Sequence, residues 1–189
     1  VLRFVAGHGD EVRQVVAASR MPRDRIAVRY GLERFPEPIE VLTRTPRTLD
    51  GAPTSVCLPH LGRFVGSVVV DRPAAYVVPA PLAAHLQRHG LAVSTVEGEL
   101  DVEVATVQEL RTEGGRAILE ASKVGDAVVS WSPSRRRAPT GSALVRTDQP
   151  LGAIAVYLCE PESDDGAVEN GLLAAAQPGQ EFPVWRVRG

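Results

Sequence analysis

The chain has 189 residues, of which 44% are hydrophobic and 23% are charged, and its formal net charge is −2. This composition predicts a globular protein with one sizeable core or two small ones. The balanced charge excludes a strong electrostatic attraction to nucleic acid or to an anionic membrane. No run of eighteen apolar residues is present that would predict a membrane-spanning helix. Two cysteines are too few for a disulfide framework.

The first third of the chain is expected to contain one helix followed by short strands. Residues 2–20 have helical periodicity, whereas period-2 alternation predicts strands over 26–30, 39–43, 55–58 and 64–70. The sequence opens with Val1 and an apolar cluster that is typical of a packed element. We therefore expect a piece of a larger polypeptide, with an apolar surface at its start.

The rest of the chain is expected to alternate strands with helices. Helices are expected over 81–89, where Gly90 ends the helix, over 151–160 with Pro150 at the first helical position, and over 167–176. Arg135–Arg137 is expected in an exposed loop. The predicted strands are 76–78, 91–96, 100–110, 118–121, 127–131, 143–146 and 182–187. The pattern predicts an α+β fold, mainly antiparallel β-sheet with three to four helices, one of them packed on the sheet near the C-terminus.

Residues 160–166 form the most distinctive segment, with four carboxylates within six residues. Asp164 and Asp165 are expected to cap the following helix, because short polar side chains accept hydrogen bonds from free backbone N–H groups there. A calcium site is the alternative, but the regular acidic alternation of a calcium loop is missing.

Two pairs of residues have the spacing of metal ligands. His8 and Glu11 form a His-x-x-Glu motif, but no third ligand with suitable context is present, and Asp10 is expected to be a helix cap. His85 and His89 stand four apart on a predicted helix, without the glutamate of a zincin between them. Their position in the last helical turn favours a dipole-stabilising role.

Other reactive side chains give weaker signals. Cys57 and Cys159 have apolar neighbours and are interpreted as buried thiols, although a single bridge between them stays open. Ser163 with His60 or His89 would suggest a hydrolase, but no Gly-x-Ser-x-Gly elbow is present.

Three strings in this sequence resemble the noncatalytic C-terminal region of bacterial zinc carboxypeptidases of the M14 class, which are similar to carboxypeptidase A. They are Arg72–Ala80, Tyr157–Gly166 and Phe182–Val187, supported by 86–93 and 148–150. The resemblance covers residues 63–187, and residues 2–20 match the last helix of the catalytic domain. It implies three parts: a trailing catalytic-domain helix (1–20), a β-rich connecting region (21–72) and an α+β accessory domain (73–189).

The resemblance implies that the chemistry lies upstream of the matched region. In that class the zinc ligands, the general-base glutamate and the arginines that hold the substrate carboxylate all precede it, so this chain is expected to contain no catalytic, cofactor-binding or metal-binding residue. Zinc is expected only in the parent metallopeptidase. The implied partners are the upstream peptidase domain and a peptide substrate, and secretion of the parent would be compatible with the resemblance. The alternative is an independent protein-binding or assembly module, which would use the exposed face of its sheet.

Overall fold

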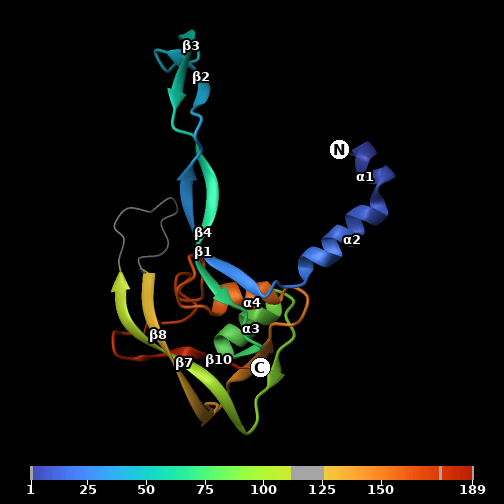
Figure 1. Ribbon diagram of the computed structural model, residues 1–189, viewed down its shortest axis with the longest axis vertical. Coiled ribbons are helices and arrows are strands. Elements are labelled where there is room, and N and C mark those ends of the chain that lie inside the picture. Colours follow the sequence, from blue (N-terminus) through green and yellow to red (C-terminus); the bar gives the residue numbers. More distant parts are fainter. Residues whose placement is uncertain (1, 112–125, 175, 189) are drawn as a thin grey trace. The chain divides into compact units, whose positions relative to one another are not determined.

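The computed structural model describes residues 2–111, 126–174 and 176–188 (Figure 1). The chain divides into two compact units, which are described separately. The sheet unit comprises residues 1–29 and 68–189, and the ribbon unit comprises residues 30–67. The division into 1–20, 21–72 and 73–189 stays a prediction.

A six-stranded sheet forms the centre of the sheet unit, with the order β6-β9-β5-β10-β7-β8. Every neighbouring pair is antiparallel. Together with the helices, this confirms the expected α+β fold. The strands are β5 (Ala75–Val78), β6 (Ser94–Thr95), β7 (Glu99–Arg111), β8 (Asp126–Arg137), β9 (Ala143–Arg146) and β10 (Glu181–Val187).

The C-terminal strand β10 lies inside this sheet, between strands that are far away in sequence. Trp185 pairs with Val77 of β5 on one side and with Val104 of β7 on the other. Phe182 and Val184 alternate along the strand and are 2% and 0% exposed. This alternation is what a strand with a buried face requires, and it confirms the strand expected over 182–187.

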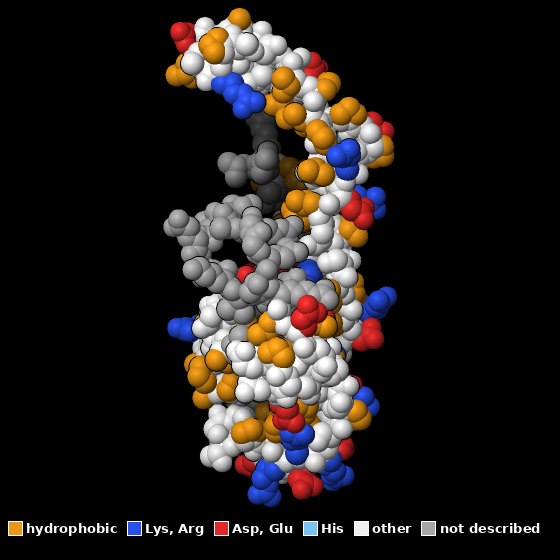
Figure 2. All heavy atoms as spheres, turned by 90° about the vertical axis from the view of Figure 1, so that its left-hand side faces the viewer, with side chains coloured by type: hydrophobic (Ala, Val, Ile, Leu, Met, Phe, Trp, Pro, Cys, Tyr) orange, Lys and Arg blue, Asp and Glu red, His pale blue; other side chains and the backbone are white. Residues whose placement is uncertain are grey.

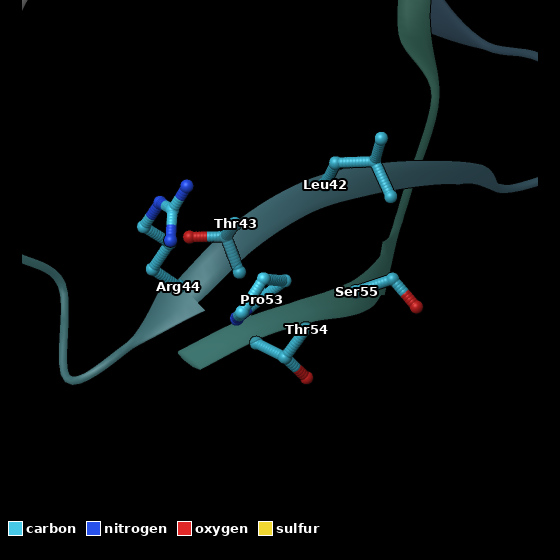
Figure 3. Close-up of a pocket in the computed structure, with 6 residues that line it drawn as sticks. All are labelled: Leu42, Thr43, Arg44, Pro53, Thr54 and Ser55. Atoms are coloured by element: carbon cyan, nitrogen blue, oxygen red, sulfur yellow. The ribbon is translucent and has the colours of Figure 1, made fainter. Parts of the chain in front are cut away.

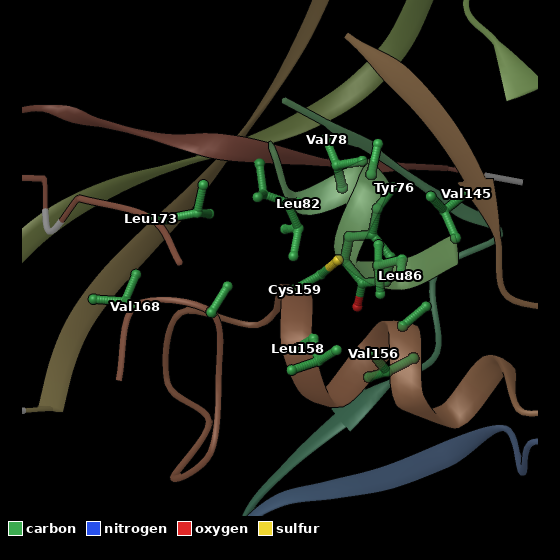
Figure 4. Close-up of a cluster of buried hydrophobic side chains, with 14 of the residues drawn as sticks. Tyr76, Val78, Leu82, Leu86, Val145, Val156, Leu158, Cys159, Val168 and Leu173 are labelled. Carbon is green, nitrogen blue, oxygen red and sulfur yellow. The ribbon is translucent and has the colours of Figure 1, made fainter. Parts of the chain in front are cut away.

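Two helices cover the sheet and form the main core with it (Figure 4). Helix α3 (Ala80–Arg88) contacts β9, and helix α4 (Gly152–Cys159) contacts β5 and β9. Leu158 is 9% exposed, as expected for a core position. The buried cluster drawn in Figure 4 includes Tyr76, Val78, Leu82, Leu86, Val145, Val156, Leu158, Cys159, Val168 and Leu173.

The start of helix α4 differs from the expectation that Pro150 occupies its first position. The helix begins at Gly152, and Leu151 before it has a left-handed backbone with φ of 65°. A Cβ atom on residue 152 would lie only 1.9 Å from the carbonyl oxygen of Thr147. The helix can therefore approach that backbone only because residue 152 is glycine.

The N-terminal segment forms two helices, not the single helix expected over 2–20. Helices α1 (Leu2–Gly7) and α2 (Gly9–Arg20) are separated at His8. His8 is the residue that precedes α2, and it makes no side-chain capping bond. Asp10 lies inside the first turn and pairs with Arg13, so the expectation that it caps the helix is wrong.

The ribbon unit consists of paired strands with little interior. Strands β1 (Arg25–Arg34) and β4 (Leu61–Asp71), which extend into both units, form one two-stranded sheet, and β2 (Ile39–Thr45) pairs with β3 (Ala52–Leu58) in another. All of residues 30–67 are described, and none of their apolar side chains is buried. Figure 2 shows hydrophobic side chains gathered along the part that carries β2 and β3.

We call the exposed large apolar side chains of residues 30–67 the apolar ribbon surface; they are Tyr30, Leu32, Ile39, Val41, Leu42, Leu49, Val56, Leu58, Leu61 and Phe64. Beside Leu42, an open depression on the β2–β3 hairpin is lined by Thr43, Arg44 and residues 53–55 (Figure 3).

Several expected elements are different in the structure. Residues 167–176 form no helix where they are described; turns fold back so that Ala167, Val168 and Leu173 are buried. Arg135–Arg137 belongs to strand β8 and pairs with Glu99–Asp101, so the expected loop is wrong. Of the strand expected over 91–96, only the short strand β6 is present. The strand expected over 118–121 lies outside the described residues. In the described part of the chain, no helix has the length and apolarity needed to cross a bilayer.

Candidate functional site

A buried polar network forms where helix α4 ends, and Glu160 is its centre. Glu160 is 1% exposed, and its Oε1 accepts hydrogen bonds from the Tyr76 hydroxyl (2.5 Å) and from Arg186 Nε (2.8 Å). Arg186 Nη2 also donates to Oε2, so the guanidinium binds both carboxylate oxygens. A bidentate pair of this kind is the geometry in which a buried charge is best compensated.

The network continues across the sheet through Trp131. The Arg186 guanidinium carbon lies 3.7 Å from the centre of the Trp131 ring, which is a cation–π distance. The four side chains Tyr76, Trp131, Glu160 and Arg186 therefore connect β5, β8, the end of α4 and β10. We call them the Glu160 network.

Burial decides the protonation chemistry of this network. Desolvation, and then the charge of Glu160, raises the pKa of Tyr76 well above its usual value, so the phenol remains a hydrogen-bond donor. Burial also raises the pKa of Cys159. Both groups are thereby held in their neutral forms, which favours a structural role for them over a nucleophilic one.

The remaining acidic residues of the segment have partners of their own. Asp164 accepts a hydrogen bond from the Tyr157 hydroxyl, and its backbone N–H donates to Val28 (3.0 Å). Asp165 accepts from Asn170 Nδ2 at 2.8 Å. The expected capping role is wrong because no helix follows, and these bonds instead stabilise the chain reversal.

The segment brings together neither calcium ligands nor a serine–histidine pair in the described residues. Over those residues, no group of three or more His, Cys, Asp or Glu side chains is placed to hold a metal ion. Ser163 is 6% exposed, and its Oγ accepts a weak bond from the backbone N–H of Asp165 at 3.4 Å. A nucleophile in that position would lie inside the turn and away from solvent.

An open pocket of about 490 Å³ lies beside the Glu160 network, and its lining includes Glu103, Glu162, Arg186 and Arg188. Arg188 binds Glu103 at 2.5 Å, and Arg186 binds Glu160, so both of these cations already have carboxylate partners. Burial and then the charge of Glu160 raise the pKa of Glu162. The pocket wall is therefore charged but electrostatically balanced.

Each of the four histidines packs against another aromatic or imidazole ring. His8 stacks on Phe4 with ring centres 4.2 Å apart, and His60 packs on Phe35 at 4.4 Å. His85 and His89 pack against each other, with their Nε2 atoms 3.0 Å apart. Gly90 ends their helix with φ of 85°, as expected.

The two cysteines do not form the bridge that the sequence left open, because both are free thiols. Cys159 is buried as expected, but Cys57 is exposed on β3, so the interpretation of both as core residues is wrong for Cys57.

Sequence reasoning missed the Glu160 network, although signals of it were present. Glu160 follows an almost wholly apolar helix, and Arg186 stands within a strand that is otherwise mainly apolar. A charge in such a position usually needs a buried partner. Nothing in the local pattern identifies that partner.

Comparisons with known proteins add no assignment: no family model, no curated protein and no solved structure matches the chain.

Proposed function

We propose that this chain is the noncatalytic C-terminal accessory region of an M14-like zinc metallocarboxypeptidase, whose parent would remove C-terminal residues from peptides. One observation carries the proposal. The three strings that resemble this class each contribute one residue to the same buried network: Tyr76 from 72–80, Glu160 from 157–166 and Arg186 from 182–187. The strings that carry the resemblance therefore include residues that stabilise the fold, as expected for a noncatalytic accessory region.

The apolar ribbon surface supports contact with a second domain. Phe64 is 70% exposed and Leu42 is 85% exposed, on two-stranded ribbons that are only marginally stable alone in water. An apolar surface of this kind is typical of a protein–protein contact. In the proposed parent, the contacting partner is the upstream peptidase domain, and through it the region would help to position peptide substrates.

An independent binding or assembly module would use the same surface, so the gene distinguishes the two functions. The accessory function requires a His-x-x-Glu pair and a distant histidine in the sequence encoded upstream of Val1. An upstream sequence without them would leave the binding module as the function.

The chain by itself is expected to release no C-terminal residue from peptides and to retain no equimolar zinc after dialysis. The reason is that a catalytic zinc needs three protein ligands, whereas the described residues contain no group of three or more His, Cys, Asp or Glu side chains placed to hold a metal ion. Zinc analysis and a peptide-cleavage assay, with His8→Ala as a matched variant, would measure this. Equimolar zinc together with chelator-sensitive cleavage that His8→Ala abolishes would contradict it.

Placing charges on the ribbon is expected to weaken its contact with the peptidase domain. The double variant Leu42→Glu, Phe64→Glu should lower affinity for that domain at least about tenfold, because two carboxylates would have to be buried in an apolar contact. Calorimetric titration with the separately expressed peptidase domain would measure this.

Ser67→Glu is the matched control for the ribbon variant, because residues 64 and 67 point to opposite faces of β4. The control should keep wild-type affinity. Equal affinity of all three proteins would exclude this surface as the contact.

A further inference from the structure

The geometry of His85 and His89 points to a metal site separate from any peptidase chemistry. Their positions one helical turn apart place both imidazoles on the same face of α3. The Nε2 atoms lie 3.0 Å apart, with the ring planes at 60°. His89 is exposed and His85 is partly exposed, so an ion can reach both nitrogens from solvent.

We propose that His85 and His89 together bind one divalent transition-metal ion, Cu²⁺ most tightly and Ni²⁺ next. The 3.0 Å distance is that of a hydrogen bond between the two nitrogens, and it shows that both Nε2 atoms can approach one point. Imidazole is a ligand that suits Cu²⁺ and Ni²⁺, and a given nitrogen site generally binds Cu²⁺ most tightly among the divalent first-row metals.

The position of the two histidines at the end of a helix also favours a bound cation electrostatically. Both histidines stand at the C-terminal end of α3, where His89 follows the last helical residue. The free carbonyl groups there carry partial negative charge, which stabilises a cation. Water molecules would complete the coordination, as expected for a surface site with two protein ligands.

Arg88 is expected to weaken metal binding, because its contact favours the His85 tautomer in which Nε2 carries the proton. The Arg88 Nη2 atom lies 3.2 Å from His85 Nδ1, and because a guanidinium only donates, Nδ1 accepts. Neutral His85 therefore keeps its proton on Nε2 and donates it to Nε2 of His89. To bind the ion, His85 must move this proton to Nδ1, which breaks the Arg88 contact and releases no proton overall.

The test is a titration of the whole chain with Cu²⁺, followed by calorimetry and electron paramagnetic resonance. We expect one ion per chain with two imidazole nitrogens in its spectrum. His85→Ala and His89→Ala should each weaken copper binding by about a hundredfold. Each variant loses the second imidazole ligand, which the helix otherwise holds next to the bound ion at a high effective concentration. Arg88→Ala should tighten binding about tenfold, the usual scale of an outer-shell contact.

His8→Ala and His60→Ala are the matched controls and should keep wild-type copper affinity. Circular dichroism of each metal-free variant checks the fold, which surface substitutions should leave intact. Copper affinity within threefold of wild type in His89→Ala would overturn the proposal, as would a loss of affinity in Arg88→Ala. Neither outcome depends on the proposed accessory function, because no peptidase domain enters the experiment.

Discussion

Replacing Glu160 with alanine is expected to lower the free energy of unfolding by about 3–5 kcal/mol, the usual cost of breaking a buried ion pair from one side. The substitution leaves Arg186, whose side chain is only 14% exposed, without its counter-charge. It also removes the acceptor of the fully buried Tyr76 hydroxyl. Urea denaturation followed by tryptophan fluorescence would measure the loss.

Glu103→Ala is the matched control, because Glu103 binds Arg188, whose side chain is 57% exposed. The Glu103 side chain is 23% exposed, against 0% for Glu160, so this pair is more accessible to water and is expected to contribute about 1 kcal/mol, well below the loss expected for Glu160→Ala. The double variant Glu160→Met, Arg186→Met should be more stable than Glu160→Ala, since no unpaired charge remains buried. Equal losses for Glu160→Ala and Glu103→Ala would show that the Glu160 network does not stabilise the fold.

Replacing Leu158 with alanine is expected to cost about 2–5 kcal/mol, as for other large core truncations. Leu158 is 9% exposed and belongs to the main core cluster, to which both α4 and β5 contribute side chains. The removed atoms lose their burial, and the surrounding side chains close the cavity only in part. The urea midpoint and slope of the purified variant would measure this change.

Leu42→Ala makes the same chemical change on a side chain that is 85% exposed. It should alter the stability by less than about 0.5 kcal/mol. If the Leu158 variant were as stable as the Leu42 variant, helix α4 would not belong to the core.

The local periodicity of the sequence was sufficient for the elements that have strong signals of their own. Helix α3 was expected within one residue of its observed bounds, because its apolar stripe and Gly90 mark it. The strand over 182–187 and the α+β class were also predicted correctly, since alternation of apolar residues depends only on neighbours along the chain. The helix predicted over 167–176 is wrong. Its alanines and leucines are compatible with a helix, but burial of this segment against the core favours turns.

Which residues meet across the molecule was decided by the tertiary structure alone. The sequence by itself determined a fold class, the main helices and a resemblance in three separate strings. Only the antiparallel order of the sheet brings Tyr76, Glu160 and Arg186 to one buried point, across 84 and 26 residues of chain. The 3.0 Å approach of His85 to His89 likewise depends on rotamers that spacing cannot specify. Periodicity encodes the face on which a side chain lies, whereas partner choice depends on the packing of the whole chain.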